Sequence, residues 1–166
     1  MGSFFGIGLI AYSQLSALAI SDVVYLIGSF GASSVLVFGV IESPLAQPRN
    51  LIGGHLVSAF IGVSVQMLIP DLLYISAPLA VSLSIVAMQM TKTLHPPGGA
   101  TALIAVTGSE QIKSLGFMYL LSPVLSGTLI LLLTALVFNN MTRHRQYPSS
   151  QKFRVFRSKI VRRIRR

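Results

Sequence analysis

Residues 92–101 read KTLHPPGGAT, and this stretch interrupts an otherwise apolar part of the chain. Pro96 has no backbone N–H group and disfavours helical geometry at His95, the residue before it. Pro97 suits the first turn of a new helix, where an N–H group would have no partner in any case. The stretch therefore predicts one helix that ends at His95 and a second helix that begins directly after the two prolines.

Apolar segments extend on both sides of this stretch. Of the 166 residues, 52% are hydrophobic and only 10% are charged, whereas soluble domains carry about 25% charged residues. A helix needs about 20 residues to cross the roughly 30 Å hydrocarbon core of a bilayer. Four segments reach or nearly reach that length, whereas residues 98–107 would rise only about 15 Å. The sequence predicts an all-α membrane protein, a bundle of four full transmembrane helices plus two short, broken or re-entrant helices. The six segments are residues 4–20, 23–41, 51–69, 75–94, 98–107 and 115–138.

The chain matches itself at an offset of 68 residues. Residues 31–38 (GASSVLVF) align with residues 99–106 (GATALIAV), and the flanking apolar segments fall into the same register. This match predicts two repeats of three segments each, residues 1–70 and 71–140. The alternative is a chance likeness between helices that are both rich in small and apolar residues.

The side of the membrane that each segment end faces depends on how the middle segments cross. Three crossings in each half give inverted repeats, whereas re-entrant middle segments give two crossings and parallel repeats. Both versions place the two termini on one side. The inverted version is favoured because Arg49 and Lys92 then lie on the cytoplasmic side, with only Lys113 outside.

The net charge of +9 is concentrated at the C-terminal end of the chain. Ten of the 13 Lys and Arg residues lie within residues 143–166, and residues 1–142 hold three basic against four acidic side chains. This distribution excludes a basic nucleic-acid-binding face and predicts a transmembrane domain, residues 1–140, with a basic cytoplasmic tail, residues 141–166. The spacing of Phe153, Phe156, Ile160 and Ile164 favours an interfacial amphipathic helix on anionic lipid. A disordered or topology-setting tail is the alternative.

Two stretches of small residues indicate where a ligand would bind. The first N–H groups of a helix have no internal partner and attract a small anion. We predict opposed helix N-termini at residues 31–34 and 99–101 that share one such anion, with Gly98 allowing the backbone to approach it. Close helix packing is the alternative interpretation of these glycines and small hydroxyl residues. Pro96 and Pro97 form the structural motif between the helices. The predicted substrate-binding residues are Gly31, Ala32, Ser33, Ser34, Arg49, Lys92, His95, Gly98, Gly99, Ala100 and Thr101.

The polar residues near the predicted membrane boundaries also have structural interpretations. Arg49 could pair with Glu42 across a rigid turn, and Lys92 could simply reach to the interface. His55 is interpreted as a packing residue that a neighbour satisfies. The chain has no cysteine and no close carboxylate pair, so we expect no enzymatic activity, no metal and no cofactor.

Several motifs in order resemble the HPP family of integral membrane proteins. They are ESPLAQPRN at residues 42–50 with GGH at 53–55, KTLHPPGGATAL at 92–103, and FNN at 138–140 followed by Tyr147-Pro148. The family is named after the His-Pro-Pro motif, and some members are associated with nitrite transport.

The resemblance implies a transporter of nitrite or a related small anion, in a bacterial or cyanobacterial plasma membrane or, alternatively, in a chloroplast inner envelope. The expected partners are nitrite, membrane lipids and further copies of the chain in a homo-oligomer, but no nucleic acid. A non-transporting scaffold that recruits lipid or protein, and a permease for a different small solute, are the competing hypotheses.

Overall fold

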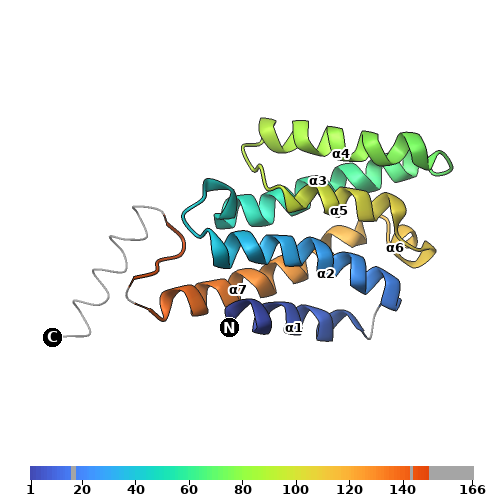
Figure 1. The fold of residues 1–166 in the computed structure, drawn as a ribbon. Helices are drawn as coiled ribbons and strands as arrows, with labels where there is room; N and C mark the ends of the chain where they lie inside the picture. Colours follow the sequence, from blue (N-terminus) through green and yellow to red (C-terminus); the bar gives the residue numbers. More distant parts are fainter. Residues whose placement is uncertain (16–17, 143, 150–166) are drawn as a thin grey trace.

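The computed structural model describes residues 1–15, 18–142 and 144–149, and these residues form helices and their connections (Figure 1). The predicted tail helix lies outside the described residues. The α-helices are α1 (Gly2–Leu15), α2 (Ile20–Ser34), α3 (Pro48–Leu68), α4 (Leu73–Met90), α5 (Pro97–Thr107), α6 (Glu110–Ser114) and α7 (Ser126–Asn140), and the shorter turns are η1 (Val35–Gly39), η2 (Pro44–Ala46) and η3 (Leu120–Leu125).

Four helical spans in the described residues are long and apolar enough to cross a membrane. The other two predicted segments are short: α1 has 14 residues and α5 has 11. The prediction of an all-α protein with four long apolar helices is therefore confirmed, whereas the described residues form three shorter α-helices, α1, α5 and α6, in place of the predicted two. The four spans are Ile20–Gly39, Pro48–Leu68, Leu73–Met90 and Leu120–Asn140.

The helices lie side by side and alternate in direction along the chain (Figure 1). The N-terminus, the α2–α3 and α4–α5 connections and the end of α7 lie together at one end of the bundle, which we call the terminal end. The opposite end is called the distal end. The last long helix of each predicted half packs against helices of the other half: α3 lies against α4 and α5, and α7 lies against α1.

Small residues let α3 and α5 approach each other closely. A Cβ atom on Gly62 would lie 2.6 Å from the carbonyl oxygen of Ala102, and one on Gly98 would lie 2.7 Å from Ser58 Oγ. Contacts this short require glycine and are typical of helix pairs in membranes. Gly98 therefore serves close helix packing, and its predicted contact with a ligand stays a prediction.

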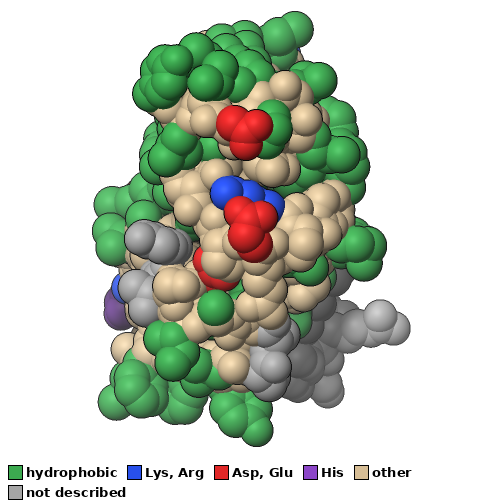
Figure 2. All heavy atoms as spheres, turned by 90° about the vertical axis from the view of Figure 1, so that its right-hand side faces the viewer, with side chains coloured by type: hydrophobic (Ala, Val, Ile, Leu, Met, Phe, Trp, Pro, Cys, Tyr) green, Lys and Arg blue, Asp and Glu red, His purple; other side chains and the backbone are tan. Residues whose placement is uncertain are grey.

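The distal end carries charged side chains in its middle, with hydrophobic side chains around them (Figure 2). Glu110 and Lys113 of α6 form an ion pair of 3.0 Å there. Buried Asp22 accepts hydrogen bonds from the N–H group of Ser109, at 3.0 Å, and from its hydroxyl group. Large apolar side chains along the helices are exposed, including Phe4, Tyr74 and Leu133. This arrangement is that of an integral membrane protein, with polar ends and an apolar belt.

Candidate functional site

Five polar side chains are buried together in the terminal half of the bundle. We call them the imidazole cluster: Ser29 and Ser33 of α2, His55 of α3, His95 of the α4–α5 connection, and Thr101 of α5. None of them is more than 2% exposed. Because a buried polar group without a partner destabilises a protein in lipid, such a cluster indicates a functional site.

Ser33 lies at the centre of the cluster and joins the two imidazole rings. Its Oγ atom is 2.8 Å from Nε2 of His55 and 2.9 Å from Nε2 of His95. The ring centroids are 5.0 Å apart. One hydroxyl group therefore serves both histidines.

The chain of hydrogen bonds continues at both ends. Nδ1 of His55 lies 2.7 Å from Thr101 Oγ1, which lies 3.0 Å from Ser29 Oγ. At the other end, Nδ1 of His95 lies 2.9 Å from the carbonyl oxygen of Leu45. All four imidazole nitrogens therefore have a partner.

The carbonyl group of Leu45 fixes the direction of every bond in the chain when both rings are neutral. A carbonyl oxygen only accepts, so His95 carries its hydrogen on Nδ1 and accepts at Nε2 from the hydroxyl of Ser33. Ser33 has then used its one hydrogen, so His55 donates to it from Nε2. His55 must in turn accept at Nδ1 from Thr101, and Thr101 accepts from Ser29.

Contacts from neighbouring helices and connections hold the imidazole cluster in place. The side-chain amide of Asn50 donates to the carbonyl oxygen of Leu94 at 2.8 Å, beside His95. The ring of Phe30 packs on His55 with centroids 5.3 Å apart, and the hydroxyl of Tyr119 donates to the carbonyl oxygen of Thr101 at 3.1 Å. The three residues that make these contacts, Asn50, Phe30 and Tyr119, come from separate parts of the chain.

The C-terminal motif residues brace the same end of the bundle. The Asn140 amide donates to the carbonyl oxygen of Tyr147 at 2.6 Å, and the Tyr147 hydroxyl donates to that of Ala46 at 2.7 Å. Burial raises the pKa of Tyr147, so its hydroxyl stays protonated and remains a donor. Ala46 directly follows Leu45, so this bond steadies the acceptor of His95.

Three of the predicted site residues join the cluster, namely Ser33, His95 and Thr101. Ser34 instead contacts Ser3, with 3.1 Å between the two Oγ atoms. Ala32 and Ala100 line an apolar surface depression together with Pro96 and Pro97.

The two predicted cations lie outside the imidazole cluster. The Arg49 guanidinium is exposed and donates to the carbonyl oxygen of Thr91 at 2.9 Å. The ion pairs of the described residues do not include Arg49 with Glu42. Lys92 is exposed and has a φ of 56°, in the left-handed region, where it follows the end of α4.

The predicted pair of opposed helix N-termini is wrong. Residues 31–34 are the last turn of α2, which begins at Ile20 and has no proline to stop it before that turn. At the start of α5, the N–H groups of Gly98 and Gly99 donate to the carbonyl oxygens of His95 and Pro96, at 2.8 and 3.1 Å. Neither N–H group is free to bind an anion.

The predicted substrate-binding residues did not include Ser29 or His55, and His55 was interpreted as a packing residue only. Ser29 and Ser33 are four residues apart and therefore face the same side of α2. His55 does have neighbours that satisfy it, as predicted, but these neighbours are the predicted site residues Ser33 and Thr101. A polar residue in the middle of a long apolar helix was the available signal.

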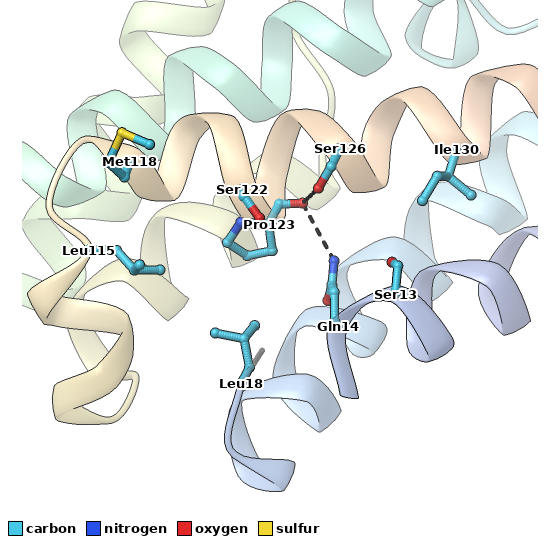
Figure 3. Close-up of a pocket in the computed structure, with 9 residues that line it drawn as sticks. All are labelled: Ser13, Gln14, Leu18, Leu115, Met118, Ser122, Pro123, Ser126 and Ile130. Atoms are coloured by element: carbon cyan, nitrogen blue, oxygen red, sulfur yellow. Dashed lines mark hydrogen bonds between the residues drawn. The ribbon is translucent and has the colours of Figure 1, made fainter. Parts of the chain in front are cut away.

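A second polar feature lies between α1 and α7 towards the distal end (Figure 3). This pocket of about 310 Å³ is bordered by Ser13, Gln14, Ser122 and Ser126 among other residues. Gln14 is 4% exposed, and its Nε2 atom lies 3.5 Å from the carbonyl oxygen of Pro123. Its Oε1 atom has no hydrogen-bond partner in the described residues. The helix breaks at Ser122, whose φ and ψ of −136° and 121° are not helical.

Potential metal ligands do not gather in the part of the chain that the structure describes. No group of three or more His, Asp or Glu side chains lies together among the residues outside 16–17, 143 and 150–166. The two imidazoles of the cluster have hydroxyl and carbonyl partners instead.

Comparisons with known proteins agree with the membrane architecture. Residues 1–148 match the family model described as HPP, transmembrane region. Two transmembrane proteins of Dictyostelium discoideum are 49% and 51% identical over 154 residues, which is 89% of this chain and 48% and 53% of the relatives. The chain thus spans about half the length of these curated relatives. No solved structure gives a significant match.

Proposed function

Because the chain belongs to the HPP family of integral membrane proteins, we propose that it transports a small inorganic anion, nitrite being the first candidate, and that the imidazole cluster is its selective site. The observation that carries this proposal is the continuous buried chain of hydrogen bonds from Ser29 to His95. The choice of nitrite rests on the family resemblance alone.

The chemistry of the cluster suits an anion that must be bound and released. A hydroxyl or imidazole N–H group donates a hydrogen bond to an anion, whereas a permanently charged lysine or arginine in this position would hold it much more strongly. A conduit must bind its substrate weakly enough to let it leave. Ser33 and Thr101 would turn their hydroxyl groups from the imidazoles to the anion.

Transport of nitrite into proteoliposomes tests the proposal. Purified protein should give saturable nitrite uptake above that of protein-free liposomes, with chloride and nitrate compared at equal gradients. The double variant Ser33→Val, Thr101→Val should lose uptake. The matched control Ser34→Ala removes a neighbouring hydroxyl outside the cluster and should retain it.

The outcomes separate the competing hypotheses. Full nitrite uptake by a folded Ser33→Val, Thr101→Val protein would exclude the cluster as the site. Uptake of another solute but not nitrite would favour a different permease. No uptake under either direction of a pH gradient would favour a membrane scaffold.

We further propose that the two halves are inverted repeats and that the terminal end faces the cytoplasm. Ser33 and Thr101 are 68 residues apart and bind the two nitrogens of the same imidazole. Corresponding helices of the halves run in opposite directions (Figure 1). Arg49 and Lys92 lie at the terminal end, whereas Lys113 lies at the distal end. The terminal end therefore has more basic residues, as the positive-inside rule expects of a cytoplasmic side.

The topology can be tested because the chain has no cysteine. A single Ser43→Cys change in the α2–α3 connection should react with an impermeant thiol reagent from the cytoplasmic side. A Ser114→Cys change in α6 should react from the other side. Labelling of both positions from one side would rule out the inverted arrangement. Self-association and anionic-lipid binding by the tail stay predictions.

A further inference from the structure

We propose that the imidazole cluster is a binding site for a single proton, which either of its two rings can accept without leaving a buried hydrogen-bonding group unpaired. For transport, the inference is that one proton travels with each anion. This second part rests on the proposed function.

The first route places the proton on His95. A new N–H bond forms at Nε2 of His95 with a proton that a hydronium ion or an undissociated acid gives up. This N–H group then donates to Ser33 Oγ, which also accepts from His55. Ser33 must turn its own hydrogen elsewhere, and the carbonyl oxygen of Ser29 lies 3.2 Å from its Oγ atom. Every group in the cluster is again paired.

The second route places the proton on His55. The new N–H bond forms at Nδ1, which then donates to Thr101 Oγ1, and Thr101 turns its hydrogen to Ser29 Oγ. Ser29 in turn donates to the carbonyl oxygen of Pro97, which lies 3.0 Å away. In the neutral cluster, the carbonyl groups of Ser29 and Pro97 receive no hydrogen bond from the cluster hydroxyls. In the protonated states, each of them can accept one.

A second proton is disfavoured by the geometry. Two imidazolium rings would have centroids only 5.0 Å apart, and like charges at this distance repel strongly in a medium of low dielectric constant. The pair therefore holds one proton at most.

Among the described residues, the hydrogen-bond partners of the imidazole cluster supply no negative charge to balance that proton. The charged and titratable groups on the surrounding elements include Asp22 of α2, which is bonded to Ser109, and exposed Glu42 in the α2–α3 connection. They also include Arg49 at the start of α3, Lys92 after α4, Tyr119 before η3 and Tyr147 beside the α2–α3 connection. The described hydrogen bonds and ion pairs of the cluster include no carboxylate. An anion is therefore the partner that a protonated cluster attracts, and the proton and anion together form a neutral pair.

Proton binding can be measured without any transport. The full chain in lipid nanodiscs, with 15N-labelled histidine and the exposed His144 replaced by His144→Gln, gives NMR signals from the two cluster rings only. We expect the pair to take up one proton in total, seen partly on each ring. Uptake of two protons, or of none over the pH range in which the protein stays folded, would overturn the proposal.

A second variant separates a shared site from two independent ones. In His95→Gln, the glutamine carbonyl can still accept from Ser33, and His55 keeps its route through Thr101 and Ser29. The number of bound protons should therefore stay at one. A fall from two protons to one would show that the rings titrate independently and would refute the shared site.

The coupling is tested in proteoliposomes that contain a pH-sensitive dye, after subtraction of the leak in protein-free liposomes. An imposed nitrite gradient should move one proton with each anion, and an imposed membrane potential of either sign should leave the rate unchanged. Nitrite uptake that follows the potential and moves no proton would overturn the coupling. If no nitrite enters at all, the proposed function fails, whereas the NMR experiment still decides whether the cluster binds one proton.

Discussion

Residues 31–34 and 99–102 look alike in sequence but belong to helices that differ in their backbone. Residues 31–34 (GASS) lie in the last turn of α2, which continues into η1. Residues 99–102 (GATA) lie in the first turns of α5, directly after His95-Pro96-Pro97. Nevertheless, Ser33 and Thr101 reach the same ring, one at Nε2 and the other at Nδ1 of His55. The two side chains thus reach one imidazole although the backbone that presents each of them differs.

The comparison shows that the hydroxyl groups, and not the helix starts, are what the two stretches share. The N–H groups at the start of α5 are bonded to the carbonyl groups of the preceding turn, and residues 31–34 contribute no helix start. The paired glycines both have room for a Cβ atom, since one on Gly31 would have no neighbour within 4 Å and one on Gly99 would meet only Val81, at 3.8 Å. Gly98, directly before the second stretch, differs because a Cβ atom there would collide with α3.

The largest expected effect concerns the two hydroxyl groups. Ser33→Ala removes the partner of two imidazole nitrogens, whereas Thr101→Val removes the partner of one, because Ser29 can turn to the carbonyl group of Pro97. A buried group left unpaired costs about 1–3 kcal/mol, so Ser33→Ala should lower the free energy of unfolding by about twice as much as Thr101→Val. Reversible unfolding in mixed detergent micelles, followed by circular dichroism, measures both. Equal losses would mean that Ser33 does not serve both rings.

The glycines give the next largest difference. Gly98→Ala places a methyl group 2.7 Å from Ser58 Oγ and 3.0 Å from the carbonyl oxygen of Gly54, and such overpacking costs about 1–3 kcal/mol. Gly31→Ala meets no neighbour and should stabilise α2 by about 0.5–1 kcal/mol, because alanine loses less backbone entropy in a helix. The same unfolding assay compares the two variants. A stable Gly98→Ala protein would show that α3 and α5 are less closely packed than described.

The sequence was sufficient to predict the long helices and the break between α4 and α5. Apolar length decides which segments can span a bilayer. The predicted helix end at His95 is wrong, because α4 already ends at Met90 and Lys92 turns the chain with a positive φ. The sequence was not sufficient for the site, because a Gly-Ala-Ser stretch is compatible with both the beginning and the end of a helix. The cause lies in long-range packing: His55 meets Ser33 and Thr101 only because α3 lies between the two halves of the chain.

The substrate-binding role of Ser33, His95 and Thr101 stays a prediction, but their proximity could have been inferred in part. The offset of 68 residues pairs Ser33 with Thr101, and a pseudo-symmetric bundle brings such pairs to a common axis. The available signal for the residue between them was His55, a polar residue within the long apolar segment 51–69. Asn50, Asn140 and Tyr147 belong to the motifs of the family resemblance, yet in the structure they brace the loops around the site.

A smaller effect tests why α4 stops where α2 does not. Lys92 has a φ of 56°, a conformation that costs an L-residue roughly 1–2 kcal/mol relative to glycine. Lys92→Gly should therefore stabilise the protein by about 1 kcal/mol relative to Lys92→Ala, which removes the same charge but keeps the strain. Thermal unfolding of the two variants side by side measures the difference. A glycine variant less stable than the alanine variant would mean that the left-handed conformation is absent.

The smallest effects are expected at Ala32 and Ala100, which the 68-residue offset also pairs. Both are exposed and line the apolar depression beside Pro96 and Pro97, whereas Ser33 and Thr101, the next residue in each stretch, are buried. Ala32→Leu and Ala100→Leu should each change the free energy of unfolding by less than about 0.5 kcal/mol, as is usual for surface positions. Nitrite uptake should also be unchanged, because a side chain on this face faces lipid and does not reach the hydroxyl groups of the cluster. Tenfold slower uptake by a folded Ala32→Leu or Ala100→Leu protein would place the substrate path at the apolar depression and not at the imidazole cluster. The feature that the two stretches share would then be their exposed alanines, and not their buried hydroxyl groups.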